Sequence, residues 1–152
     1  MKKIFQILTV ATFLVTSSTC FAISGDGTRF LQYEEAVKSA TYGHIDARGL
    51  KALMDANSPF VLLDARGKSY SDPMKIPGSK LAHYKLSQEE IEEIVPDKND
   101  LIVVYCFSFG CPLSRNLADK LVELGYKNVL EYPAGLKEWR DIAEYPALPM
   151  EK

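Results

Sequence analysis

The sequence holds little positive charge in any one place. Its 152 residues include 18 Lys and Arg against 20 Asp and Glu, and no basic run follows the first three residues. Nucleic acids and anionic membrane surfaces are recognised by clustered Lys and Arg, so neither is an expected partner. Internal repeats and low-complexity tracts are also absent. With 47% apolar and 25% charged residues, the chain has the length and composition of one globular domain.

The first 22 residues indicate export rather than a part of the fold. Lys2 and Lys3 precede an apolar stretch at residues 4–15, and Ala22 is the last residue of a segment that suits a cleavage site. This layout is typical of a secretory signal peptide. The apolar stretch is also short for a helix that spans a membrane, so we expect no stable membrane insertion.

Cleavage after Ala22 predicts three segments: a signal peptide at 1–22, a polar N-terminal lead-in at 23–43 and a domain at 44–152. The mature protein is then periplasmic or secreted. Two alternatives stay open at this point, namely an anchor that is not cleaved and a lipid attached to Cys20.

Cysteine is scarce, and the chain has only three. Cys20 leaves with the signal peptide, so the mature protein keeps Cys106 and Cys111. In an oxidising compartment two cysteines form a disulfide by default. Only four residues lie between this pair, and closing so small a loop removes little entropy from the unfolded chain. The pair therefore needs a chemical explanation.

Strands and helices are expected to alternate after the lead-in. Residues 60–63 and 101–105 are short apolar runs that suit strands buried on both faces. Asp46 is a helix N-cap, and Ser87 with Glu90 forms a capping box. The pattern predicts an α/β fold, a three-layer sandwich in which helices cover both faces of a mainly parallel sheet. The expected strands are 60–63, 79–84, 101–105 and 128–132, and the expected helices are 30–39, 46–56, 87–95, 112–124 and 136–142.

The most informative segment joins a strand to a helix through a cysteine loop. Cys106 follows strand 101–105, at the end where open α/β sheets place their ligand crevice, and Pro112 begins the helix. Backbone N–H groups in such a loop form an anion-binding nest that also favours a thiolate. Gly110 is expected to supply the backbone angles of the turn. The alternative is that Cys106 is only a buried apolar residue. The loop begins at Cys106 and continues through Phe107, Ser108, Phe109, Gly110 and Cys111.

The order of the motifs resembles the rhodanese-like family, whose members are built on the rhodanese homology domain. The resemblance runs from about His44 to Pro146, and the cysteine loop is one of its motifs. The other four are Leu63-Asp64-Ala65-Arg66, Ile76-Pro77-Gly78-Ser79, Gly125-Tyr126-Lys127-Asn128-Val129 and Gly135-Leu136-Lys137-Glu138-Trp139.

This resemblance implies a sulfurtransferase in which Cys106 is the nucleophile. Cys106 would take the outer sulfur of a polysulfide, a persulfide or thiosulfate and hold it as a persulfide. It would then pass the sulfur to a thiophilic acceptor such as cyanide, sulfite or a thiol, including a protein thiol. The loop amides would stabilise the persulfide anion, and the reaction needs no metal and no organic cofactor.

The cysteine loop departs from the family pattern because it carries no charge. Many members have Arg after the cysteine and at the sixth position of the loop, where this chain has Phe107 and Cys111. Thiosulfate is a dianion, so the missing guanidinium favours a polysulfide or an organic persulfide as donor. Phe107 and Phe109 either line the mouth of the loop or pack inward. Cys111 either resolves the persulfide of Cys106 to a disulfide or is a packing residue.

Three further residues match supporting positions of the family. Asp64 and Arg66 are expected to form an ion pair that anchors the neighbouring loop rather than to act in catalysis. Ser114 lies in the first helical turn, where capping of backbone groups is favoured over a hydrogen bond to the loop. The two histidines, His44 and His83, are expected on the surface or in loops.

Three other functions compete with sulfur transfer. A thiol–disulfide redox protein could use Cys106 and Cys111, although thioredoxin-like motifs have two residues between the cysteines. A phosphatase would need a longer loop that ends in Arg, which this chain lacks. A non-catalytic rhodanese-like module would use the crevice only to bind a ligand or partner.

Overall fold

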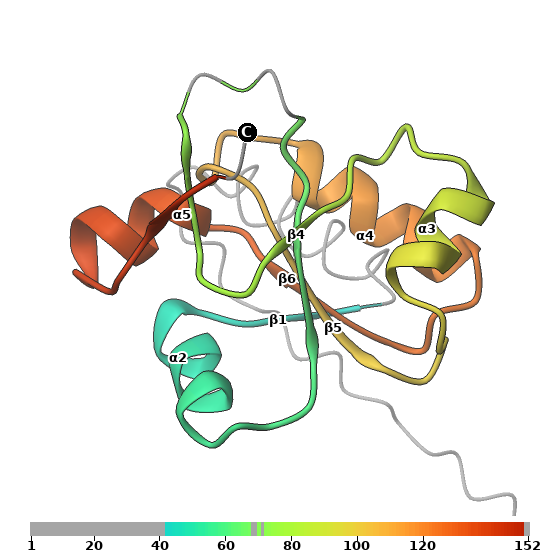
Figure 1. Cartoon of the computed structure of the whole chain (residues 1–152), viewed down its shortest axis with the longest axis horizontal. Helices are drawn as coiled ribbons and strands as arrows, with labels where there is room; N and C mark the ends of the chain where they lie inside the picture. Colours follow the sequence, from blue (N-terminus) through green and yellow to red (C-terminus); the bar gives the residue numbers. More distant parts are fainter. Residues whose placement is uncertain (1–41, 68–69, 71, 151–152) are drawn as a thin grey trace, which may run out of the picture.

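The fold is built around one parallel sheet. The computed structural model describes residues 42–67, 70 and 72–150. Five strands lie in the order β1-β6-β5-β2-β4, and every neighbouring pair is parallel (Figure 1). Parallel strands have to be joined by crossovers, and helices provide three of the four here. The strands are β1 (Gly43–His44), β2 (Val61–Asp64), β4 (Lys80–Leu81), β5 (Leu101–Tyr105) and β6 (Asn128–Tyr132).

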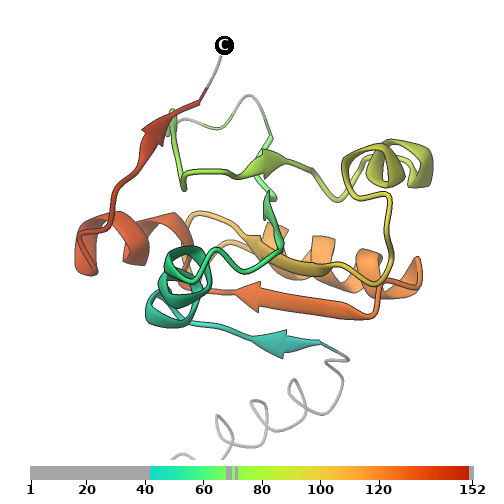
Figure 2. The same ribbon diagram turned by 60° about the horizontal axis from the view of Figure 1, so that its bottom comes forward.

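Helices cover both faces of the sheet, which confirms the predicted three-layer architecture. One face packs against α3 and α4, and the other against α2, α5 and the π-helical turn η1, as Figures 1 and 2 show. Alternate residues of β5 supply the two cores: Ile102 and Val104 face α3 and α4, whereas Val103 and Tyr105 face the other side. The helices are α2 (Ala47–Asp55), α3 (Gln88–Ile94), α4 (Leu113–Glu123) and α5 (Gly135–Lys137), followed by η1 (Glu138–Ile142).

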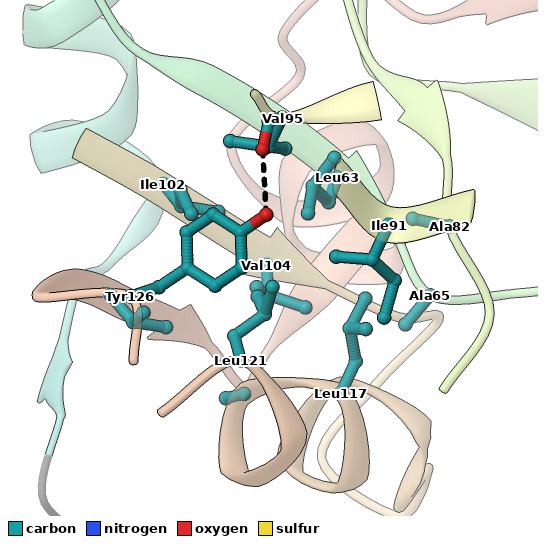
Figure 3. Packing of buried hydrophobic residues seen from close by; sticks show 12 residues of the cluster. Leu63, Ala65, Ala82, Ile91, Val95, Ile102, Val104, Leu117, Leu121 and Tyr126 are labelled. Atoms are coloured by element: carbon teal, nitrogen blue, oxygen red, sulfur yellow. Dashed lines mark hydrogen bonds between the residues drawn. The ribbon is translucent and has the colours of Figure 1, made fainter. Parts of the chain in front are cut away.

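The core beneath α3 and α4 also satisfies its polar groups. Figure 3 shows Leu117 and Leu121 of α4 pointing toward Ile102 and Val104 of β5. Tyr126 closes this core, and its hydroxyl donates a 2.6 Å hydrogen bond to the carbonyl of Val95. A buried tyrosine hydroxyl needs such a partner, so the tyrosine ties the end of α4 to the end of α3.

Most predicted boundaries agree with the structure because capping residues set them. Asp46 accepts a 2.7 Å hydrogen bond from the amide of Gly49, and Ser87 forms the predicted capping box with Glu90. Gly125 ends the long helix with φ of 88°, a conformation that favours glycine.

The differences lie in short elements. The strand expected at 79–84 is only two residues long in β4. Two unpredicted strands, β3 (Met74–Lys75) and β7 (Leu148–Pro149), form an antiparallel pair of their own. The last helix begins at Gly135 rather than at Leu136, and it widens into η1.

The predicted signal peptide at 1–22 and the helix at 30–39 lie outside the described residues. Within the described part of the chain, no helix is both long enough and apolar enough to cross a bilayer.

Candidate active site: the cysteine loop after β5

The cysteine loop closes on itself through a disulfide between Cys106 and Cys111, whose Cα atoms are 6.3 Å apart. Strand β5 ends at Tyr105, so Cys106 begins the loop at the carboxyl edge of the sheet. The amide of Cys111 donates a 2.9 Å hydrogen bond to the carbonyl of Ser108, which makes the second half of the loop a tight turn. Cys106 is fully buried and Cys111 is partly exposed. The structure is therefore the oxidised form of the site.

The backbone amides between the two cysteines are available to a ligand. Within the described residues, the N–H groups of Phe107, Ser108, Phe109 and Gly110 donate to no protein acceptor. The loop then enters α4 through Pro112, which sits at the N-cap without a side-chain cap hydrogen bond. Unpaired amides beside a helix N-terminus are suited to attract an anion, and anion binding by this loop stays a prediction.

The short helix α5 holds the cysteine loop in place. The amide of Leu136 donates a 3.0 Å hydrogen bond to the carbonyl of Cys106, and that of Lys137 a 2.8 Å bond to the carbonyl of Phe107. Gly135 has φ of 60°, and a Cβ atom there would clash with the Cys106 carbonyl. The sequence contained this glycine in its last motif, but nothing in the pattern revealed that it touches the cysteine loop.

Gly110 does not have the role that the sequence suggested. Its φ lies outside the left-handed region, and a Cβ atom there would meet nothing within 4 Å. The turn is closed by the hydrogen bond between Cys111 and Ser108 instead, a geometry that any residue can adopt at this position. The prediction that Gly110 supplies special backbone angles is therefore wrong.

The two phenylalanines of the loop point in different directions. Phe107 packs against the core on the α2 and α5 side, and its ring centroid is 5.9 Å from that of Tyr70. Phe109 is 78% exposed. The structure therefore separates two residues that the sequence treated alike: Phe107 forms part of a wall, and Phe109 projects from the loop.

The predicted ion pair between Asp64 and Arg66 is present and lies beside the cysteine strand. Both side chains are fully buried, and the guanidinium binds the carboxylate in a bidentate manner at 2.6 and 2.8 Å. Arg66 also donates to the carbonyl of Met74 at 2.6 Å. Burial disfavours the Arg66 cation, but the hydrogen bonds and charge of Asp64 outweigh it and raise the pKa of Arg66 above its ordinary value. The pair fixes the segment that follows β2.

Tyr105 connects this ion pair to the cysteine. Its hydroxyl donates to Asp64 at 2.8 Å, accepts from the amide of Ile76 at 3.1 Å and lies 3.0 Å from the hydroxyl of Ser79. Burial and the charge of Asp64 raise the pKa of Tyr105 above its usual range, so the hydroxyl stays protonated. The network shows why two motifs far apart in sequence meet at the residue before Cys106.

Ser114 does not cap the helix, contrary to the sequence prediction. Its hydroxyl donates a 2.9 Å hydrogen bond to Glu131 of β6, and both side chains are buried. The second carboxylate oxygen of Glu131 lies 3.3 Å from Nε2 of His44, which is half exposed on β1. A glutamate in a strand gave no signal of this role, because its partners come from two other elements. His83 accepts a 3.2 Å hydrogen bond from the amide of Lys85 in a turn, as expected for a loop histidine.

Two pockets border the loop. One, of about 460 Å³, includes Phe107 and the ion pair between Arg140 and Asp72. The other, of about 310 Å³, lies between the loop tip and the last helix. Its lining residues are Ser108, Phe109, Gly110, Ala134, Lys137, Glu138 and Ile142.

Comparison with known proteins gives the same assignment as the motifs. The model of the family described as the rhodanese-like domain matches residues 46–142. The chain belongs to the rhodanese-like family. The matched range includes Cys106 and Cys111. No curated protein matches the sequence.

Solved structures with the same fold come from several bacteria. The BH2092 protein of Bacillus halodurans is 20% identical with a TM-score of 0.64, and the match covers 80% of this chain and 86% of that one. A protein of Lactobacillus plantarum is 21% identical with a TM-score of 0.64, covering 82% and 99%. A thiosulfate sulfurtransferase of Pseudomonas aeruginosa is 24% identical with a TM-score of 0.63, covering 81% of this chain but 23% of that longer one. At these identities the similarity shows the fold.

Proposed function

We propose that this protein is a sulfurtransferase that carries sulfane sulfur on Cys106. The observation that carries the proposal is the loop of four unpaired amides between Cys106 and Cys111, placed at the carboxyl edge of the sheet. These amides stabilise the negative charge of a persulfide as it forms. The rhodanese-like family and a sulfurtransferase with the same fold support the assignment.

Two transfers complete the reaction. The Cys106 thiolate attacks the outer sulfur of a donor R–S–S⁻, which leaves Cys106–S–S⁻ and releases R–S⁻. A thiophilic acceptor such as cyanide then attacks the outer sulfur, which restores the Cys106 thiolate and gives thiocyanate. Sulfite and small or protein thiols are further acceptors of the same class. Each step moves one sulfur atom without net change in charge or electrons.

The donor is a polysulfide or an organic persulfide rather than thiosulfate. The loop offers backbone dipoles but no guanidinium. Arg140 lines the adjacent pocket, but it is paired with Asp72 at 2.8 Å and with Asp141 at 2.6 Å. A sulfonate group would have to compete with both carboxylates for this cation.

Cys111 ends the persulfide state when no acceptor is present. Its thiol attacks the inner sulfur of Cys106–S–S⁻, which forms the Cys106–Cys111 disulfide and releases HS⁻. The structure has this disulfide. Cys111→Ser should therefore lengthen the lifetime of the persulfide and leave the first transfer intact. An unchanged lifetime would reduce Cys111 to a packing residue.

The protein acts outside the cytoplasm, in the periplasm or as a secreted protein. The signal-peptide layout of residues 1–22 supports this location. Sequencing the N-terminus of protein from the periplasm should give Ile23 as the first residue. An acylated Cys20 at the N-terminus would instead show a lipoprotein.

The test of the proposed function is the rate of thiocyanate formation from polysulfide and cyanide after reduction of the protein. The wild type should turn over, and Cys106→Ser should not, because this change conserves size and removes only the nucleophile. Thermal unfolding of both proteins shows whether the fold is kept. A wild-type rate in Cys106→Ser would contradict the site, and an inactive wild type would favour a non-catalytic module.

The disulfide also supports a second candidate, a thiol–disulfide redox protein. In that case a substrate protein should be trapped as a mixed disulfide on a variant with one cysteine removed. Thiocyanate formation by the wild type together with no trapped substrate would favour the sulfurtransferase.

A further inference from the structure

The pocket between the cysteine loop and the last helix has exposed apolar side chains on its wall, and it also has a lysine and adjoins the disulfide. Phe109 and Ile142, which are 78% and 73% exposed, are the two most exposed large apolar residues of the described chain, and both line this pocket. Large apolar side chains that are exposed together mark binding sites. The volume of about 310 Å³ lies at the lower end of the range for small-molecule sites.

The pocket wall also carries a positive charge that no carboxylate neutralises in an ion pair in the described part of the chain. Lys137 lies on its wall and takes part in none of the ion pairs found in the described part of the chain. The other charged lining residue, Glu138, accepts a 2.8 Å hydrogen bond from the hydroxyl of Tyr132. The nearby Asp141 is bound by Arg140 at 2.6 Å. The cation therefore stands available to an acidic group on a ligand.

The disulfide adjoins this pocket through Gly110, and its two cysteines are not equally accessible. Cys106 is fully buried and Cys111 is partly exposed, and Gly110 of the pocket wall is the residue before Cys111. A thiolate that arrives from solvent meets Cys111. The leaving group is then the Cys106 thiolate, which the loop amides and the start of α4 stabilise, and a stabilised thiolate leaves faster.

We infer that this pocket binds an organic thiol with an apolar chain and an acidic group, and that this thiol opens the disulfide by attacking Cys111. The thiolate R–S⁻ forms R–S–S–Cys111 and releases the Cys106 thiolate. A second R–S⁻ attacks the sulfur of the bound R group, which gives R–S–S–R and frees Cys111 as a thiolate. Cys106 is reduced and the organic thiol is oxidised. The inference rests on the proposed function, because opening the disulfide returns Cys106 to sulfur transfer.

The experiment measures how fast three thiols open the disulfide of the full oxidised protein. The thiols are 6-mercaptohexanoate, its amine counterpart 6-mercaptohexylamine, and the shorter 3-mercaptopropionate. Each rate is divided by the rate of the same thiol with the uncharged 2-hydroxyethyl disulfide, which removes differences in intrinsic reactivity without adding a charge preference. The normalised rate of the long acid should exceed that of the amine about fivefold and that of the short acid about tenfold. Equal normalised rates for the three thiols would overturn the inference.

Matched variants locate the effect. Ile142→Ser should lower the rate of the long acid about fivefold, whereas Leu148→Ser, which removes an exposed apolar residue outside the pocket, should leave it unchanged. Lys137→Gln should remove the preference for the acid over the amine, and Lys127→Gln, at the opposite end of β6, should retain it. Equal effects of each variant and its control would contradict the assigned pocket.

The position of the first mixed disulfide tests the direction of attack. After rapid alkylation, peptide mass spectrometry should find the organic thiol on Cys111 and the alkyl group on Cys106. The reverse pattern would overturn the proposed attack on Cys111. No sulfur donor is present in these measurements. They therefore test the thiol site independently of sulfur transfer. If the reduced protein accepts no sulfur from polysulfide in the separate assay, the proposed function is contradicted and the thiol site is not.

Discussion

Two neighbouring strands end in turns of opposite character. At the end of β2, Asp64 and Arg66 bury two charges in a hydrogen-bonded network. After β5, the loop from Cys106 to Cys111 carries no charge and leaves four amides unpaired. Buried charges are tolerated only when each one is paired, so the first turn can anchor but not react. Unpaired amides beside a nucleophile are what an incoming anion needs. The comparison separates a supporting turn from the turn that we propose to be reactive.

The largest effect on stability is expected from the supporting turn. Arg66→Met should lower the free energy of unfolding by about 3–5 kcal/mol, because it leaves the carboxylate of Asp64 buried without its partner. Arg140→Met breaks an ion pair that solvent screens and should change stability far less. Urea unfolding of the two variants and the wild type measures both effects. Equal losses would show that the buried pair is not the anchor.

A smaller effect on stability is expected at the contact between Gly135 and the cysteine loop. Gly135→Ala should lower stability by about 2 kcal/mol, because alanine is strained at φ of 60° and its Cβ would clash with the Cys106 carbonyl. It should also slow sulfur transfer by displacing the loop. Gly110→Ala meets no neighbour and should stay within about 0.5 kcal/mol of the wild type. If the two variants are equally stable in thermal unfolding, Gly135 does not hold the loop.

The smallest of the three effects concerns charge in the loop. Phe107→Arg should raise kcat/KM for thiosulfate about tenfold, the ratio expected for one charge-assisted hydrogen bond, and change the rate with polysulfide little. Phe109→Arg is the control, since this side chain projects into solvent and should give a smaller increase. The measurement is the initial rate of the wild type and of both variants with thiosulfate and with polysulfide. A thiosulfate rate that stays at the wild-type value in Phe107→Arg would remove the charge argument.

Long elements with strong local signals could be predicted from the sequence. The apolar run 101–105 is buried on both faces and gave the bounds of β5, and the run 128–132 gave those of β6. Capping residues fixed the starts of α2 and α3 for the same reason, because their hydrogen bonds are local. The two-residue strand β1 could not be predicted, since its pairing depends on β6 more than eighty residues later in the chain.

The candidate site could be predicted only in part. Cys106 and the loop were visible as a strand, a cysteine and a helix start, and the Asp64–Arg66 pair was predicted from its match to a motif of the family. The partner of Ser114 could not be predicted. Glu131 lies 17 residues away in a strand, where an acidic side chain is normally expected to be exposed. The contact of Gly135 with the cysteine loop was hidden for a similar reason: long-range contacts leave no periodic pattern in the sequence.

The most direct test of the account is the mass of the reduced protein after brief treatment with polysulfide. The wild type should gain about 32 Da, the mass of one sulfur atom added as a persulfide, and fragmentation should place it on Cys106. Cys111→Ser should gain the same mass and keep it longer. A protein that gains no sulfur, or a Cys106→Ser variant that gains as much as the wild type, would contradict the assignment of Cys106 as the sulfur carrier.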